Sequence, residues 1–96
     1  MTRIIWSPQA LRDVESLRAY IAEDSPQYAD LVVRRIVACV ERLALFPESG
    51  RVVPERNRPA IREVIVEPFR VVYRVRAGTV EIATVFRASR LFPERF

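Results

Sequence analysis

Alternating apolar and polar positions dominate the second half of the chain and predict strands. The run IREVIVEPFRVVYRVRAGTVEIATVFRASR covers residues 61–90 and is broken only at Glu67-Pro68 and Ala77-Gly78. Because glycine tolerates a positive φ, Ala77-Gly78 is expected to form a two-residue hairpin turn. The run is therefore predicted to fold as an antiparallel meander of three strands.

The predicted turn fixes which side chains of the last two strands share a face. One face is almost wholly apolar and pairs Val75 with Val80, Tyr73 with Ile82, Val71 with Thr84 and Phe69 with Phe86. The other face mixes arginines with aliphatic residues and pairs Arg74 with Glu81, Val72 with Ala83 and Arg70 with Val85; Ile61, Glu63 and Ile65 share it. No element of the chain is expected to cover this second face, so we expect a partner to cover part of it.

Two amphipathic segments precede the meander and predict helices. Ser7-Pro8 and Ser25-Pro26 each place a capping serine before a proline at the first helical position. Apolar residues then recur at helical spacing: first Ala10, Leu11, Val14, Leu17 and Ile21, then Ala29, Val32, Val33, Ile36, Val37, Val40, Leu43 and Ala44. The second helix is expected to end at Phe46-Pro47. The short linker between the two helices predicts an antiparallel hairpin.

The remaining segments complete an α+β domain. Residues 3–6 are apolar enough for a short strand, and residues 89–96 predict no element. Residues 47–60 contain three prolines and predict an exposed loop, in which Arg51-Val52-Val53 could add a short strand. The loop is either functional or merely mobile on this evidence. We predict a single domain spanning residues 1–96, with an N-terminal antiparallel helical hairpin packed on a small, mainly antiparallel β-sheet.

The composition excludes several classes of protein. The longest apolar runs are too short to span a bilayer, and the N-terminus lacks the pattern of a signal peptide. The single Cys39 cannot form an internal disulfide, which fits a reducing compartment. We therefore expect a cytoplasmic protein without a membrane partner.

The charged residues constrain the chemistry further. All 16 basic residues are arginine, so neither histidine nor lysine is present to act as a general base near neutral pH. Residues 1–50 hold six Arg and seven Asp/Glu, a net charge of −1, whereas residues 51–96 hold ten Arg and five Glu, a net charge of +5. The basic half favours an anionic partner, although such an asymmetry can equally serve solubility.

Three arginines are the candidate site. In the predicted register Arg87 is a diagonal neighbour of Arg70 on the open face, and Arg90 follows just beyond the strand. Guanidinium groups so clustered would bind a phosphate or another anion. The alternative is that these arginines form surface salt bridges with Glu63, Glu81 or Glu94, as expected for Arg74 opposite Glu81. Without histidine, a cysteine pair or a glycine-rich loop, the sequence indicates no metal site and no cofactor.

The order of motifs resembles the RelE/ParE superfamily of bacterial toxin–antitoxin toxins, often labelled plasmid-stabilisation proteins. The motifs are Ser-Pro-x-Ala-x-x-Asp at 7–13, Tyr-Ile-Ala-Glu-Asp-x-Pro at 20–26, Leu-x-Leu-Phe-Pro-Glu-x-Gly-Arg at 43–51, Arg-Glu-x-x-Val at 62–66, Phe-Arg-x-x-Tyr-Arg-Val at 69–75, Val-Glu-Ile at 80–82 and Val-x-Arg-x-x-Arg at 85–90. The resemblance implies a toxin held inactive by a cognate antitoxin whose extended segment wraps it, with operator DNA contacted only through that complex. RelE-like members cleave mRNA on the ribosome, and ParE-like members poison DNA gyrase.

The residues present favour the gyrase branch of this family. Arg70 and Arg90 match the family's strand and post-strand arginines, but the lysines and the C-terminal tyrosine of the nucleases are absent, and Arg87 stands where histidine often occurs. RNA cleavage needs a proton acceptor and a donor besides charge stabilisation. We therefore expect a non-enzymatic gyrase inhibitor. The alternatives are a ribosome-dependent mRNA endoribonuclease acting through Arg70 and Arg90, and a degenerate member that binds only its antitoxin.

Overall fold

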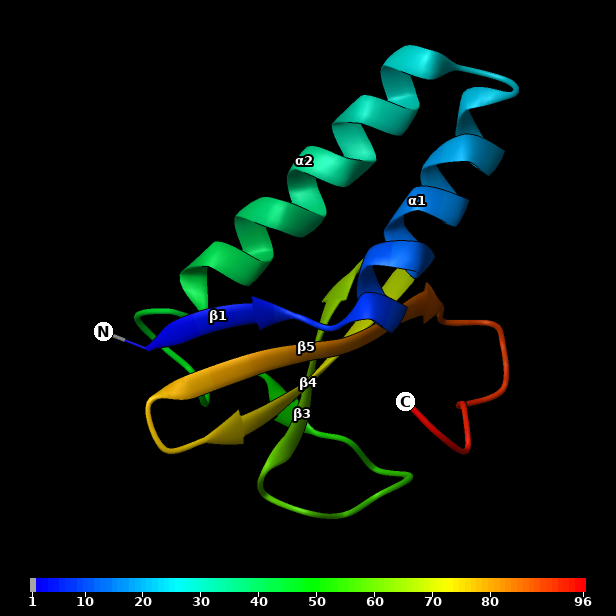
Figure 1. Ribbon diagram of the computed structural model, residues 1–96. Coiled ribbons are helices and arrows are strands. Elements are labelled where there is room, and N and C mark those ends of the chain that lie inside the picture. The colour runs from blue at the N-terminus through cyan, green and yellow to red at the C-terminus, as the bar shows by residue number, and fades with distance from the viewer. Residues whose placement is uncertain (1) are drawn as a thin grey trace.

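Two helices pack on one face of a five-stranded sheet, which confirms the predicted α+β class (Figure 1). The computed structural model describes residues 2–96 of the chain. Its elements are β1 (Arg3–Trp6), α1 (Pro8–Ala22), α2 (Pro26–Arg42), β2 (Arg51–Val52), β3 (Ile61–Val66), β4 (Phe69–Arg76) and β5 (Thr79–Arg87). Neither helix in this described range is long and apolar enough to cross a membrane.

The sheet has the strand order β1-β5-β4-β3-β2. Strands β3, β4 and β5 form the predicted antiparallel meander, and Gly78 has a φ of 70° in the turn between β4 and β5. Strand β1 pairs in parallel with β5, so that Arg3 lies opposite Thr79. The first strand of the chain is thus an edge strand next to the last one.

Both helices begin at the predicted caps. Ser7 Oγ accepts a hydrogen bond from Ala10 N at 3.0 Å, and Ser25 Oγ accepts one from Tyr28 N at 3.1 Å. The expected hairpin forms and is joined across its surface by Arg18–Asp30, a salt bridge of 2.7 Å.

Two details of the predicted helices are wrong. Leu11 is 51% exposed, because the face of α1 that meets the sheet is centred on Ala10. Helix α2 ends at Arg42, before the predicted Phe46-Pro47, because the backbone N–H groups of residues 43–45 bond three residues back and the last turn tightens.

The main core lies between the helices and the sheet. It joins Val32, Ile36 and Val40 of α2 to apolar residues of β3, β4 and β5, including Val71, Tyr73, Val80, Ile82 and Val85. Tyr73 is fully buried, and its hydroxyl oxygen accepts a hydrogen bond from Gly50 N at 2.9 Å. A side chain at Gly50 would begin 2.5 Å from that oxygen, so the chain can pass here only with glycine.

The predicted register between β4 and β5 is right near the turn and wrong beyond it. The pairs Val75–Val80, Arg74–Glu81 and Tyr73–Ile82 form as expected, but a β-bulge then leaves Ala83 without a partner in β4. The observed pairs beyond the bulge are Val72–Thr84, Val71–Val85, Arg70–Phe86 and Phe69–Arg87. One extra residue exchanges the faces of a strand, so Val85 joins the helix side and Phe86 moves to the side of Arg70.

The second face of the sheet is not left open, contrary to the prediction. The C-terminal tail, residues 88–96, folds back over it, and Phe92 and Phe96 pack against a smaller core of Val53, Val72 and Phe86. Figure 1 shows the tail returning from the end of β5 toward this side of the sheet. The prediction fails because the bulge supplies Phe86 as an apolar platform for the tail, which the expected register placed on the other face.

Candidate functional site

Arg70 is held by two carboxylates on the tail side of the sheet. It is 8% exposed, and its Nε donates to Glu63 Oε1 at 2.5 Å. Its two terminal nitrogens donate to both oxygens of Glu55, at 2.9 and 2.8 Å. Arg51 Nε donates to the other oxygen of Glu63 at 2.6 Å. Three of the five N–H groups of Arg70 are therefore engaged, including both of the nitrogens that would grip a phosphate.

The electrostatics of this cluster oppose proton transfer. The hydrogen bonds from Arg70 lower the pKa of the Glu55 carboxyl from 4.5 to about 2. The same bonds to Glu55 raise the pKa of the Arg70 guanidinium above its ordinary value. A carboxylate so strongly stabilised as an anion is a poor proton acceptor at neutral pH. Glu55 therefore clamps the 53–60 loop to the sheet and does not serve as a general base.

Aromatic rings from β5 and from the tail complete the enclosure of Arg70. Its guanidinium carbon lies 5.4 Å from the ring centre of Phe86 and 5.0 Å from that of Phe92. The guanidinium carbon of Arg56 lies 5.4 Å from the ring centre of Phe92 and 5.0 Å from that of Phe96. The arginines and phenylalanines thus interleave across this face and fix the tail through cation–π contacts.

Arg74 ends this series and confirms one sequence-based pairing. Its guanidinium carbon lies 4.7 Å from the ring centre of Phe96, and its Nη1 donates to Glu81 Oε1 at 3.0 Å. The expected Arg74–Glu81 salt bridge is therefore present.

The structure separates Arg87 from Arg70. Arg87 pairs with Phe69 across the strands, and its guanidinium carbon lies 5.4 Å from the Phe69 ring centre. The expectation that Arg87 is a diagonal neighbour of Arg70 on one face is wrong, because the bulge at Ala83 reverses the faces at the end of β5.

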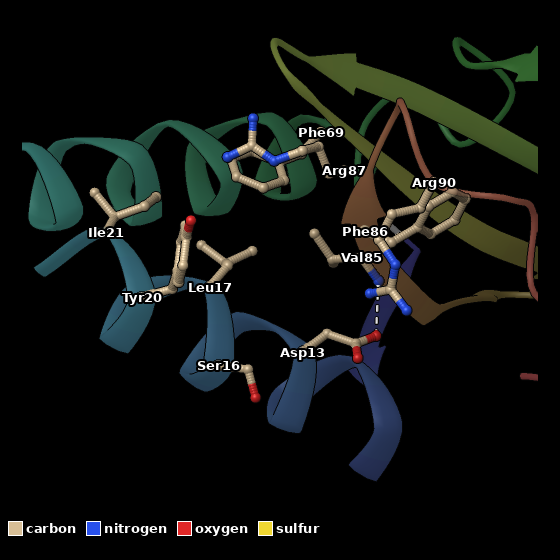
Figure 2. A pocket seen from close by; sticks show the side chains of 10 residues that line it. All are labelled: Asp13, Ser16, Leu17, Tyr20, Ile21, Phe69, Val85, Phe86, Arg87 and Arg90. Carbon is tan, nitrogen blue, oxygen red and sulfur yellow. Dashed lines mark hydrogen bonds between the residues drawn. The ribbon is translucent and has the colours of Figure 1, made fainter. Parts of the chain in front are cut away.

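Arg87 and Arg90 do come together, on the helix side. Both line a pocket of about 310 Å³ between α1 and the end of β5, with Tyr20 and Asp13 in its wall (Figure 2). Neither arginine forms a salt bridge within residues 2–96. The three candidate residues are therefore divided between one neutralised arginine and two unpaired ones.

Ser7 and Asp13, two residues of the first motif, hold the segment of β5 that forms one wall of this pocket. Ser7 Oγ donates to Ala83 O at 2.8 Å, and Asp13 Oδ2 accepts from Thr84 Oγ1 at 2.6 Å and from Val85 N at 3.0 Å. They bind the bulged segment of β5 from α1 and so fix the reversal that separates Arg87 from Arg70. The sequence showed the serine only as a helix cap.

Sequence reasoning also missed Glu55. It lies in the proline-containing loop, for which the pattern gives no position relative to the sheet. Among residues 2–96 no group of three or more histidine, cysteine or acidic residues could hold a metal ion.

The fold and its motifs agree with known toxins. Residues 4–92 match the family described as the ParE toxin of the type II toxin–antitoxin system parDE. The chain belongs to the ParE toxin family. It is 39% identical over 96% of its length to Y4kP of Sinorhizobium fredii, named as a candidate toxin, and covers 94% of that protein. It is 33% identical over 95% of its length to toxin RelE2 of Caulobacter vibrioides and covers all of it.

Two solved structures share the fold. A chain of the chromosomal ParDE toxin–antitoxin system from P. aeruginosa superposes with a TM-score of 0.74 at 26% identity, covering 91% of this ParE-family chain and 96% of the other. YoeB of Staphylococcus aureus, solved as a dimer, shares the fold, with a TM-score of 0.59 at 19% identity over 86% and 92% of the two chains. This protein is a type II toxin, and membership of the family implies a cognate antitoxin.

Proposed function

We propose that this ParE-family toxin inhibits DNA gyrase without catalysing a reaction, in the cytoplasm, until its antitoxin neutralises it. The observation that carries the proposal is the enclosure of Arg70 by Glu55 and Glu63. A nuclease needs the strand arginine free to stabilise charge on the scissile phosphate. Here a phosphate would have to displace two carboxylates from a nearly buried guanidinium.

The neighbouring groups give no acid–base pair either. Glu55 is held as an anion by its lowered pKa of about 2. Burial raises the pKa of Tyr73, which lies on the helix side of the sheet and accepts a hydrogen bond from Gly50. General acid–base catalysis near neutral pH requires groups that titrate near that pH. The cluster therefore supports a binding function better than RNA cleavage.

Purified toxin should inhibit supercoiling by gyrase and accumulate the enzyme with cleaved DNA. The Glu55→Gln variant separates the two mechanisms, because it removes one of the two charges that neutralise Arg70, the one held by its terminal nitrogens. On our proposal neither wild type nor Glu55→Gln cuts translated mRNA, and both inhibit gyrase. New cut sites in translated transcripts that disappear with Arg70→Ala would establish the endoribonuclease alternative, and normal growth with normal supercoiling would establish a degenerate antitoxin-binding member.

We propose the groove between α2 and β3 as the surface for the antitoxin. Strand β2 pairs only with Arg62 and Glu63, so residues 64–66 of β3 have no strand on the side away from β4. Ile65 on this edge is 42% exposed, and the nearby Phe46 is 62% exposed. An exposed edge flanked by apolar side chains favours the addition of an extended segment as a further strand.

The groove also suggests the chemistry of that segment. Two adjoining hollows, of about 490 and 440 Å³, are lined by Cys39, Ile65 and the arginines Arg35, Arg42 and Arg51. An apolar strand with acidic residues would match them, and operator DNA would be reached only through the resulting complex. Ile65→Asp should abolish protection by co-expressed antitoxin while the toxin stays active, whereas unchanged protection would exclude this edge.

A further inference from the structure

We propose that the pocket between α1 and the end of β5 binds a protein segment carrying a large apolar side chain next to a carboxylate. Its volume of about 310 Å³ is at the lower end of the range for ligand sites and suits one such side chain. The inference rests on the proposed function only in taking this segment to belong to the toxin's target. The binding itself does not depend on which target is attacked.

The floor of the pocket is apolar. Leu17 and Ile21 of α1 face Phe69 of β4 and Val85 of β5 across it. Figure 2 shows Val85 between the two arginines, and Leu17 beside Tyr20 on α1. Tyr20 is 68% exposed, so its ring can contact a partner that covers the opening. Burying an apolar side chain here would contribute about 1.5–3 kcal/mol if its enclosure were complete.

The charges at the rim favour a carboxylate. Arg87 and Arg90 leave the same turn, where Arg90 N donates to Arg87 O at 2.9 Å, and their guanidinium groups lie on two sides of the pocket. Arg87 rests on the Phe69 ring, which orders the side chain without neutralising it. Asp13 is the nearby acid, but its oxygens accept from Gln9, Thr84 and Val85.

The opposite wall argues against nucleic acid as the occupant. The residues of α1 that line the pocket carry one charge, on Asp13, and residues 8–24 as a whole have a net charge of −2. A nucleic acid presents a continuous row of phosphates and needs a broad positive surface. One carboxylate beside an apolar group can instead be placed at Arg87, on the side of the pocket away from Asp13.

Nuclear magnetic resonance titration of the ¹⁵N-labelled toxin tests the pocket directly. The probe is the peptide acetyl-Glu-Leu-Glu-amide, with acetyl-Lys-Leu-Lys-amide as its charge-reversed counterpart and oligo(dT) as the nucleic-acid comparison. We expect the acidic peptide to shift the amides of residues 17–21 and 85–90, and its affinity to fall about tenfold in Arg87→Gln and in Arg90→Gln. Arg76→Gln, which removes an equal charge from the exposed end of β4, should leave the affinity unchanged.

Equal shifts with the lysine peptide, stronger binding of oligo(dT) at the same amides, or shifts confined to the α2–β3 groove would overturn the proposal. Gyrase inhibition by the same variants is a separate readout. Loss of inhibition in Arg87→Gln and Arg90→Gln, with unchanged antitoxin binding, would assign the pocket to the target. If gyrase is not inhibited by wild type at all, the proposed function fails while the peptide titration still decides the pocket.

Discussion

Asp13 should be essential for the stability of the domain, because it accepts a hydrogen bond from a backbone N–H group that has no partner in the sheet. Asp13→Ala removes the acceptor for Thr84 Oγ1 and for Val85 N. Val85 is 3% exposed, so water cannot replace the lost acceptor at its N–H group. The substitution thus leaves an unpaired donor at the bulge in β5.

The cost follows from these two bonds. A hydrogen bond to a charged group contributes about 1.5–3 kcal/mol, and an unsatisfied buried donor costs about 1–3 kcal/mol. Because the Thr84 hydroxyl can rotate toward another acceptor, we count the Val85 bond fully and the Thr84 bond in part. Asp13→Ala should therefore lower the free energy of unfolding by about 3 kcal/mol, and Asp13→Asn, which keeps one acceptor oxygen, by about 1 kcal/mol.

Urea denaturation followed by circular dichroism measures this loss. For a domain of this size Asp13→Ala should lower the urea midpoint by about 2 M and Tm by about 10–20 °C. Glu15→Ala is the matched control, since Glu15 is an exposed acid on the same helix, and its effect should stay within about 0.5 kcal/mol. An Asp13→Ala variant as stable as Glu15→Ala would refute the idea that this carboxylate holds the bulge.

The remaining predictions concern the two glycines and the clamped loop. Gly50→Ala should cost about 2–4 kcal/mol in urea denaturation, because the new methyl group would lie 2.5 Å from the buried Tyr73 oxygen. Gly78→Ala is its comparison: nothing lies within 4 Å, so only the positive φ is strained and about 1 kcal/mol is expected. Equal losses would contradict the steric argument. Because the pKa of Glu55 falls from 4.5 to about 2 on folding, its ion pair with Arg70 stabilises the protein fully above about pH 4.5 and is lost as the pH falls to about 2. Solvent screening leaves this contribution near 1 kcal/mol, so the urea midpoints of wild type and Glu55→Gln should differ at pH 7 and converge toward pH 2; a constant difference would contradict it.

Local signals in the sequence were sufficient to predict both helices and the strands of the meander. Ser7-Pro8 and Ser25-Pro26 determine where the helices begin through bonds made within one turn, and Gly78 marks its turn by its positive φ. Such features depend on neighbours in the chain, which is why the α+β class and the meander could be predicted.

The candidate site could not be predicted as well, because it depends on a bulge. No glycine or proline marks Ala83, and the bulge is held by Ser7 and Asp13, more than 65 residues away in the chain. One unpaired residue reversed the faces of Phe86 and Arg87. The position of the tail could not be predicted either. It has no periodic pattern of its own, and it packs on Phe86 only because the bulge moves Phe86 to that face.

The parallel pairing of β1 with β5 has a consequence for how the toxin is made. Arg3 must pair with Thr79, and Ser7 must bond to Ala83, so β1 cannot join the sheet until β5 has been synthesised. Contacts so distant in sequence close late and slow the folding of a small domain. A ribosome-bound chain interrupted before β5 lacks this pairing, the bulge and both arginines of the pocket. The toxin therefore acquires its proposed binding surface only after β5 and Arg90 have been synthesised, and chains interrupted before this point should be inert.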